Sequence, residues 1–229
     1  MFKALADMHI HSTYSDGRAS PKEIILTAIY KGLNIISITD HNSFQGSVAA
    51  SKLAKDLVRE YGEQLLVIIG NEVRSDKGDI LVYCYEPIDV PRRVDYLIDK
   101  AHENNCLVVP AHPFDTLRFG VGDALFEYNG WDAIEVWNAS ANPRANREAL
   151  KASKILGIPG IANSDAHIPE AIGSAYTVLE LDKLSVESVF KAIKNGKVHP
   201  HFGYPPFKVF IKRVEWSIER RVRKFLGRE

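Results

Sequence analysis

The chain contains, at residues 5–38, the stretch LADMHIHSTYSDGRASPKEIILTAIYKGLNIISI, which predicts a strand, a helix and a second strand in succession. Residues 5–10 and the apolar run at residues 33–38 both have the length and pattern of strands. Between them, Ser20 is placed to cap a helix, and Glu23 is placed to complete a capping box. A helix that separates two strands is typical of a β-α-β unit, so we expect these strands to pair in parallel.

The same alternation continues along the chain. Further helices are predicted near residues 44–60, 91–105, 143–156 and 185–195, and further strands at residues 65–70, 79–84, 107–110, 132–137, 158–162 and 175–181. This order favours an α/β fold with a largely parallel sheet or barrel. Only residues 73–78 separate Glu72 from Asp79, which is too short for a crossover helix. Strand 79–84 is therefore predicted to pair antiparallel with residues 65–71.

Length and composition exclude several classes of protein. The 229 residues fit a single β/α barrel or a compact two-lobed α/β domain, and 45% hydrophobic residues indicate a sizeable core. The net charge of zero provides no global field that would attract nucleic acid or membrane. No apolar run is long enough to span a membrane, and Cys84 and Cys106 are too few for a disulfide framework. We therefore expect a soluble, cytoplasmic protein.

The C-terminal tail differs from the rest of the chain. After a break at residues 199–206, we expect a barrel domain at residues 1–207 to be followed by a separate segment, residues 208–229. This segment carries eight basic residues against three glutamates, so its net charge is +5 and that of the remainder is −5. Its apolar residues recur at helical spacing: Val214, Ile218, Val222 and Phe225. Two interpretations remain open, namely a helix that packs its apolar stripe on the barrel and a basic helix that contacts phosphates or another anionic surface.

Potential metal ligands follow several of the predicted strands. His9 and His11 lie two residues apart at the end of the first strand, so they share one face with Asp7. Four further strands are also followed by such residues, and a turn near the first strand adds another: Asp40 and His41, Glu72, His112, Asp165 and His167, and Asp16 in the turn. A β/α barrel gathers these strand ends at one face, so the side chains are expected to converge.

The donor atoms limit the identity and number of the metal ions. Only nitrogen and oxygen ligands are available, which suits zinc, manganese or iron. Two or three divalent ions are expected, because one catalytic ion requires three or four ligands and, with Asp40 left out, eight candidates remain: His9, His11, Asp16, His41, Glu72, His112, Asp165 and His167. Glu72, with two carboxylate oxygens, is the natural bridge between them.

Taken together, these motifs resemble the PHP (polymerase and histidinol phosphatase) domain. The resemblance extends from residue 5 to about residue 182, and its motifs are Asp7-x-His9-x-His11-Ser12, Ser15-Asp16-Gly17, Thr39-Asp40-His41, Glu72, Ala111-His112-Pro113, Ser164-Asp165-Ala166-His167 and Ile172-Gly173. It implies a distorted seven-stranded β/α barrel with a bi- or trinuclear metal centre. Members of this family are phosphoesterases, including histidinol phosphatases, nucleotide phosphatases and exonucleases associated with DNA polymerases.

The resemblance also implies a distribution of ligands. His9, His11, Glu72 and Asp165 would surround one metal ion, and Asp16, His41 and His167 would hold a second. Glu72 and His112 would lie at a third ion, which in the family takes another histidine from the strand after Glu72. In this chain that strand contains no histidine, and Asp79 is the candidate oxygen ligand in its place.

The expected activity is hydrolysis of a small phosphomonoester, such as a nucleotide or a metabolite phosphate, by metal-activated water. Candidates for substrate binding are Arg74, Arg118, Arg144 and Asn138, and candidates for a catalytic role are Asp40, which would orient the histidine cluster, and His201. His199 is a further histidine outside the strand-end pattern with a route to the site. The alternatives are a nuclease that trims nucleic-acid ends through the basic tail, and a non-catalytic accessory subunit that binds metal or nucleic acid.

Overall fold

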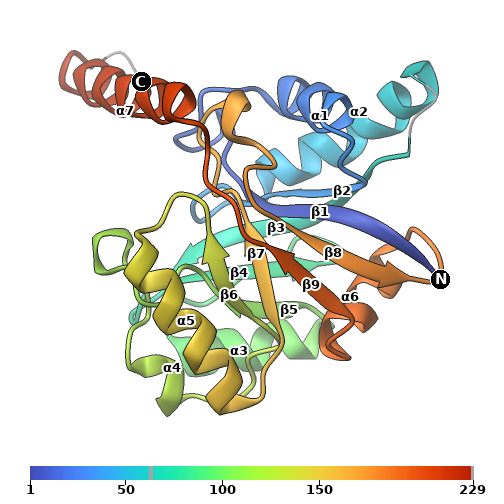
Figure 1. The fold of residues 1–229 in the computed structure, drawn as a ribbon, viewed down its shortest axis with the longest axis vertical. Helices are drawn as coiled ribbons and strands as arrows, with labels where there is room; N and C mark the ends of the chain where they lie inside the picture. Colours follow the sequence, from blue (N-terminus) through green and yellow to red (C-terminus); the bar gives the residue numbers. More distant parts are fainter. Residues whose placement is uncertain (62–63, 228–229) are drawn as a thin grey trace.

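The computed structural model describes residues 1–61 and 64–227 and shows a strongly curved sheet with helices along its outer side (Figure 1). The strands are β1 (Phe2–Ile10), β2 (Ile35–Ile38), β3 (Leu66–Arg74), β4 (Asp79–Cys84), β5 (Leu107–Pro110), β6 (Ile134–Asn138), β7 (Gly160–Asn163), β8 (Tyr176–Leu181) and β9 (Val198–His201). The helices are α1 (Pro21–Tyr30), α2 (Gln45–Tyr61), α3 (Val94–Glu103), α4 (Ala124–Glu127), α5 (Pro143–Leu156), α6 (Val186–Lys194) and α7 (Phe207–Phe225), with short 3₁₀ turns η1 (Thr116–Arg118) and η2 (Pro169–Ala171).

The larger sheet contains seven strands in the order β5-β4-β3-β2-β1-β8-β9, and β6 and β7 form a second, parallel pair. Strands β1, β2 and β3 pair in parallel, as the β-α-β pattern predicts. Strand β4 pairs antiparallel with β3, which places Leu81 opposite Glu72 and confirms the predicted hairpin. Contacts of β6 with β5 and of β7 with β9 close the structure into a distorted α/β barrel.

The prediction of a largely parallel sheet is wrong for the seven-stranded part. Strand β5 is antiparallel to β4, β8 is antiparallel to β1, and β9 is antiparallel to β8. Between β7 and β8 the chain forms only the short turn η2, and no helix returns it to the other end of the barrel. Strand β8 therefore runs back along β1 in the opposite direction. Strand β9 also occupies part of the predicted break, where alternate side chains remain exposed.

The signals around α1 are confirmed in detail. The Ser20 side chain accepts a hydrogen bond from the Glu23 backbone N–H, and the Glu23 carboxylate accepts one from the Ser20 N–H at 2.8 Å. These two bonds satisfy donors that a helix N-terminus would otherwise leave without partners. The apolar face of α1, with Ile24 and Ile25, is buried against the sheet. The β-α-β unit is therefore fixed by its own local sequence.

A separate apolar cluster fills the inside of the barrel. It includes Ala4, Ala6 and Met8 of β1, together with Tyr83 of β4. The Tyr83 hydroxyl donates a hydrogen bond of 2.8 Å to the Met8 carbonyl, so this buried phenol has a partner. Small residues on β1 leave room for the larger side chains that come from the opposite strands. The barrel interior is thus a packed core beneath the strand ends.

The two cysteines form one disulfide bond, Cys84–Cys106, which joins the end of β4 to the residue before β5. The sequence correctly predicts that there is no disulfide framework, but it does not predict this single bond. The bond closes the segment that contains α3, and both cysteines are buried. Stable disulfides are typical of oxidising compartments and of the cytosol of hyperthermophiles. The cytoplasmic location therefore stays an untested prediction.

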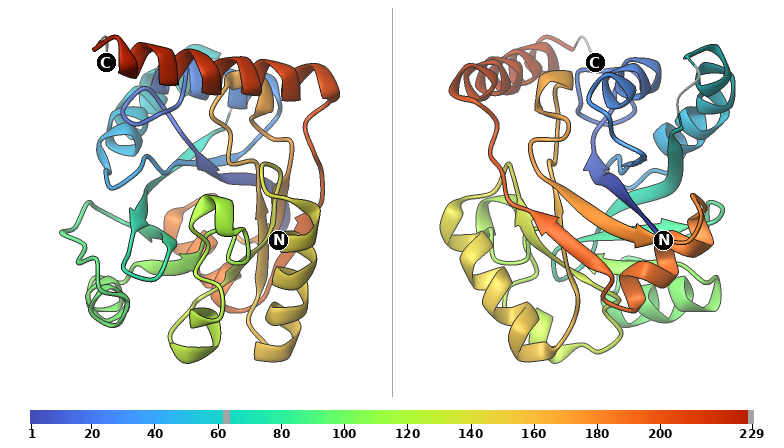
Figure 2. Two further views of the ribbon diagram at one scale, coloured as in Figure 1. Left: turned by 90° about the vertical axis from the view of Figure 1, so that its left-hand side faces the viewer. Right: turned by 45° about the vertical axis from the view of Figure 1, so that its right-hand side comes forward.

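Helix α7 lies across the end of the barrel at which the loops after β1 and β7 gather (Figure 2). The prediction that its apolar stripe packs on the barrel is wrong, because Val214, Ile218, Val222 and Phe225 are 41–88% exposed. The opposite face, with Trp216, contacts the barrel instead. In the described part of the chain no helix, α7 included, has the length and apolar character needed to cross a membrane. The last two positions of the predicted tail, Arg228 and Glu229, lie outside the described residues.

Candidate metal centre

Glu72 lies at the centre of a cluster formed by the strand ends. Its Oε1 atom is 3.1 Å from His112 Nε2 and 3.4 Å from His9 Nε2. Its Oε2 atom is 2.9 Å from His41 Nδ1 and 3.3 Å from His11 Nε2. The carboxylate therefore faces two pairs of imidazoles with its two oxygens. This is the arrangement expected of a ligand that bridges two metal ions.

Three imidazole groups lie close to one carboxylate oxygen of Asp16. Asp16 Oδ1 lies 3.2 Å from His167 Nε2 and 3.5 Å from His11 Nδ1. The same atom is 3.6 Å from His41 Nε2. The other oxygen, Oδ2, forms an ion pair with Arg220 of α7. Asp16 thus joins the cluster to the helix above it.

Asp165 completes the cluster from the loop after β7. Its Oδ1 atom is 3.3 Å from His11 Nε2 and 3.6 Å from His9 Nε2, and its Oδ2 atom is 2.7 Å from Arg118. Asp165 and His112 both adopt positive φ angles, of 50° and 32°. Such angles are unfavourable for residues with a Cβ atom, and backbone strain of this kind is found mostly at functional sites. Here it coincides with two side chains directed into the cluster.

The position at which the family pattern has one more histidine contains Asp79. Donor atoms of Asp79, His41 and Glu72 lie within 4.8 Å of one another. Burial and the nearby Glu72 carboxylate raise the pKa of Asp79 to about 6. Arg74 forms an ion pair with Asp79, with one contact at 2.9 Å. The role of Asp79 as an oxygen ligand stays a prediction, but the geometry places it beside Glu72.

Electrostatic interactions inside the cluster favour ionised carboxylates. Burial would raise the pKa of Glu72, but the surrounding histidines, His9 first among them, hold it well below its usual range. Burial would likewise lower the pKa of His41, but hydrogen bonding to Glu72 raises it to about 9. Negative and positive groups therefore compensate one another in the absence of metal. Bound cations would take over the role of the imidazolium protons.

The donor set fits divalent metal ions. Within the described residues, four overlapping groups have donor atoms that lie within 4.8 Å of one another: His11, Asp16, His41 and His167; His9, Glu72 and His112; His9, His11 and Asp165; and His41, Glu72 and Asp79. Among the described residues, His11 Nδ1 and His112 Nδ1 are buried and have no hydrogen-bond partner. Buried polar atoms without partners are costly in a folded protein. Coordination of a cation would satisfy such atoms.

Glu135 contacts the cluster and was missed by the sequence analysis. It is fully buried in β6, and its Oε1 atom lies 2.9 Å from His9 Nδ1. Its Oε2 atom accepts hydrogen bonds from the His112 backbone N–H and from Asn138 Nδ2. When one ring nitrogen of a histidine binds a metal ion, a carboxylate that accepts a hydrogen bond from the other ring nitrogen fixes the tautomer and the orientation of the imidazole. The available signal was a carboxylate in the middle of the predicted strand 132–137, with apolar residues on both sides.

Asp7 and Asp40 support the cluster without joining it. The strand register of β1 shifts between Asp7 and Ile10, and the Asp7 carboxylate accepts hydrogen bonds from the backbone N–H groups of Ser164 and Gly173. Burial raises the pKa of Asp7 to about 6. Asp40 accepts hydrogen bonds from the hydroxyl group of Ser12 at 2.6 Å and from that of Ser15 at 2.6 Å. Asp40 therefore stabilises the loop that contains Asp16.

The structure brings some of the remaining candidates to the cluster and places others elsewhere. Arg74 and Arg118 line the cleft above the cluster, and buried Asn138 donates a hydrogen bond to Asp165 at 3.2 Å. Arg144 is exposed on α5 and does not line the cleft. His201 is exposed in β9, where its ring stacks on Tyr176. His199 is also exposed and is paired with Glu180, so neither histidine of β9 reaches the metal ligands.

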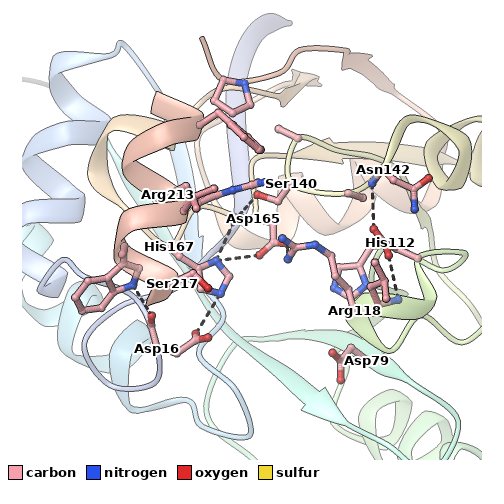
Figure 3. Close-up of a pocket in the computed structure, with 18 of the residues that line it drawn as sticks. Asp16, Asp79, His112, Arg118, Ser140, Asn142, Asp165, His167, Arg213 and Ser217 are labelled. Atoms are coloured by element: carbon pink, nitrogen blue, oxygen red, sulfur yellow. Dashed lines mark hydrogen bonds and ion pairs between the residues drawn. The ribbon is translucent and has the colours of Figure 1, made fainter. Parts of the chain in front are cut away.

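The cleft above the cluster has a volume of about 920 Å³ and is bounded by two elements that are distant in the sequence. One wall is the loop around η1, with Arg118 and Phe119, and the roof is α7. Figure 3 shows Arg118 and Arg213 pointing into the cleft from different sides, near Asp165 and His167. Cationic and apolar side chains thus surround the opening above the ligands.

The sequence is similar to one family model and to several known proteins. A family model described as PHP-associated matches residues 143–198. The uncharacterized protein MJ1587 of Methanocaldococcus jannaschii is 32% identical over 146 residues, which are 58% of this chain and 81% of that protein. The uncharacterized protein MJ1295 of the same organism is 31% identical over 186 residues, covering 72% and 82% of the two chains. The chain belongs to the PHP family.

The fold agrees with this assignment. A two-domain protein from Bacteroides vulgatus, described as containing a predicted PHP-like metal-dependent phosphoesterase, superimposes with a TM-score of 0.67 at 20% identity. The match covers 88% of this chain, which spans 65% of the length of that protein. The PHP-type barrel predicted from the strand-end motifs is therefore confirmed.

Proposed function

We propose that this PHP-family chain is a metal-dependent phosphoesterase that hydrolyses a small phosphomonoester, such as a nucleotide or a metabolite phosphate. The observation that carries this proposal is the convergence of six histidine and carboxylate side chains around Glu72 at the floor of a cleft: His9, His11, Asp16, His41, His112 and Asp165. His167 adds a further imidazole through its contact with Asp16. This donor set suits two or three ions of zinc, manganese or iron.

Metal ions bound by these residues would supply an activated water at neutral pH and neutralise charge on the phosphate. The protein's own residues would position the substrate and the ligands. Arg118 is directed at Asp165, and its guanidinium has further N–H groups available for a phosphate oxygen. Asn138 holds the Asp165 carboxylate, and Asp40 holds the Asp16 loop. We therefore propose Arg118 for substrate binding and Asn138 and Asp40 as positioning residues.

The size of the cleft supports a small substrate. Its volume of about 920 Å³ lies within the range of about 300–1,000 Å³ that is typical of small-molecule sites. Apolar side chains at its opening, Phe119 from the η1 loop and Phe207 and Phe210 from α7, offer contacts to a non-phosphate group. A nucleotide or a compact metabolite phosphate would satisfy both features.

The direct test is turnover of p-nitrophenyl phosphate and of a nucleotide panel by protein loaded separately with manganese, zinc or iron. We expect hydrolysis that requires metal and that is abolished in a His9→Ala/His11→Ala variant. If the wild type contains stoichiometric metal and hydrolyses no member of the panel, the proposal fails. In that case the non-catalytic role of a metal-binding accessory subunit becomes the better interpretation.

A nuclease is the second candidate, and one observation favours it. Arg220, Arg221 and Lys224 of α7 border a second hollow that begins at Asp16 and His41. A row of cations that leads to the metal ligands suits a single-stranded nucleic-acid end. An Arg221→Gln/Lys224→Gln variant should then bind an oligonucleotide more weakly and with a smaller salt dependence. Unchanged binding and salt dependence would count against the nuclease.

A further inference from the structure

Two arginines from distant parts of the chain approach the same point above the metal ligands. Arg118 comes from η1 and contacts Asp165 Oδ2 at 2.7 Å. Arg213 comes from α7, and Figure 3 shows its guanidinium extending toward Asp165 and Ser140. Both arginines line the cleft, together with His167. The roof and one wall of the cleft therefore each contribute a guanidinium.

Arg213 is not explained by the contacts of the folded chain. Its Nη1 group is buried and has no hydrogen-bond partner in the part of the chain that the structure describes. Burial and the nearby positive charge of Arg118 lower the pKa of Arg213, and the Asp165 carboxylate offsets this only in part. A buried N–H group without an acceptor and two like charges side by side both oppose folding. Such an arrangement is expected where a ligand supplies the missing negative charge.

The side chain of Arg213 is nevertheless held in place. Its guanidinium carbon lies 5.3 Å from the centre of the Phe210 ring, which is one turn earlier on α7. The helix itself is anchored by the Trp216 N–H, which donates to the Asp16 carbonyl at 3.0 Å, and by Lys212, which pairs with Glu170 at 2.9 Å. The guanidinium is thus oriented by contacts that leave part of its N–H surface free for a ligand.

We propose that Arg213 and Arg118 form an arginine clamp that binds the phosphoryl group of the substrate, so that α7 is part of the active site. This inference rests on the proposed phosphoesterase function and adds a residue from the basic tail to it. Guanidinium groups bind phosphate oxygens in a bidentate manner. The chain division expected at residue 207 would then separate two structural units that share one site.

The arginine clamp also favours a particular charge on the substrate. Asp165 contacts both His9 and His11, so its negative charge would be balanced by metal when the cluster is loaded. Two guanidinium groups and the metal ions would then face the phosphoryl group together. This positive field stabilises a dianionic monoester more than a singly charged diester. The expected substrate class is therefore a terminal phosphoryl group and not an internal phosphodiester.

The test is binding of inorganic phosphate to the manganese-loaded full-length protein, measured by calorimetry in wild type, Arg213→Gln, Arg118→Gln and Arg213→Lys. Arg223→Gln is the matched control, because Arg223 lies on the same helix but pairs with Glu219 and does not line the cleft. We expect Arg213→Gln to weaken phosphate binding about 10- to 100-fold, as for the loss of a hydrogen bond between charged groups. Arg213→Lys should have an intermediate effect, and Arg223→Gln should have none.

Thermal unfolding separates a ligand-binding role from a structural one. If Arg213 is present for a ligand, Arg213→Gln should leave the unfolding midpoint of phosphate-free protein unchanged or raise it, because the variant removes a partly buried positive charge that Arg118 disfavours. If Arg213 merely fastens α7 to the barrel, the same variant should lower the midpoint. The metal content should be the same in all variants, which excludes an indirect effect through the cluster.

The outcomes distinguish the clamp from the proposed function. Phosphate binding that depends on Arg213 without turnover of any ester would support the arginine clamp and refute the phosphatase. Turnover with identical phosphate affinity and KM in Arg213→Gln and Arg223→Gln would refute the clamp and leave the phosphatase standing. Absence of phosphate binding to loaded wild type at millimolar concentration would also refute the clamp.

Discussion

His9, His11 and Glu72 at the floor of the cleft are at most 1% exposed, whereas the apolar stripe of α7 above them is 41–88% exposed. The floor is built from strand ends in the packed barrel, and each ligand is fixed by several neighbours. The roof is held by the Trp216 N–H donor, by ion pairs of Lys212 and Arg220, and by packing of Val209 and Trp216 at the edge of one core cluster. The difference indicates that the packed barrel fixes the positions of the cluster side chains. Access to the cleft, in contrast, depends on a helix that fewer contacts hold in place.

The largest effect is expected at the centre of the floor. Glu72→Gln replaces a carboxylate that faces four imidazoles with a neutral amide. Because both oxygens act together, we expect loss of bound metal and a fall in kcat/KM on the order of a thousandfold. Metal content and phosphatase activity measured on the same sample check this. Glu180→Gln, on the exposed side of β8, is the matched control and should behave like wild type.

A smaller effect on metal binding is expected at Glu135, which contacts a candidate ligand but does not belong to the cluster. Glu135→Gln keeps the size of the side chain but removes the charge that holds His9 Nδ1. Loss of such a supporting carboxylate weakens metal affinity by about 10- to 100-fold. Competition with a fluorescent chelator measures that affinity. An affinity equal to that of a Glu148→Gln control, at a partly exposed position on α5, would show that Glu135 does not orient the ligand.

Stability should show the contrast between floor and roof directly. Tyr83→Phe removes a buried hydrogen bond to the Met8 carbonyl inside the barrel, and Trp216→Phe removes one between α7 and the Asp16 carbonyl. We expect the first to lower the free energy of unfolding by about 1–2 kcal/mol and the second by about 0.5 kcal/mol or less. Urea denaturation of both variants provides the comparison. Equal losses would mean that α7 is as firmly integrated as the barrel.

The smallest effect concerns the ion pair that anchors α7. Lys212 and Arg18 contribute to holding the pKa of Glu170 at about 2, although burial opposes them. A carboxyl group with a lowered pKa stabilises the folded state above its usual pKa, and this contribution is lost as pH falls toward 2. Because the pair is partly exposed, its effect should stay below about 1 kcal/mol.

The measurement for this prediction is the free energy of unfolding of wild type and Glu170→Gln between pH 7 and pH 3. We expect the variant to be slightly less stable at pH 7, and the two proteins to converge as the pH falls. A difference that is constant over this range would show that the charge of Glu170 does not anchor the helix.

Much of the floor could be predicted from the sequence, because its signals are local. The caps of α1 are short-range hydrogen bonds, and the six-residue connection between Glu72 and Asp79 allows only a hairpin. Ligands at the ends of apolar strands also carry their own signal, since a barrel brings strand ends together. For this reason the sequence predicts the members of the cluster without knowledge of the order of strands in the sheet.

The remaining features depend on long-range contacts that no local pattern encodes. An amphipathic pattern shows that α7 has two faces, but it does not show which face meets the barrel, and the polar contacts of Trp216 and Arg220 decide this. Glu135 was missed because it lies inside a strand and not at its end. His201 was a candidate because it is a histidine with a route to the site, but the antiparallel β9 directs it to the surface.

The central claim is that the strand-end cluster holds the divalent ions required for phosphate ester hydrolysis. The most direct measurement is elemental analysis of wild-type protein after loading with manganese, zinc or iron and removal of free metal, with activity assayed on the same samples. The account predicts two or three equivalents per chain for at least one metal, in the sample that hydrolyses p-nitrophenyl phosphate. Less than one equivalent for all three metals, or equal activity before and after chelation, would contradict it.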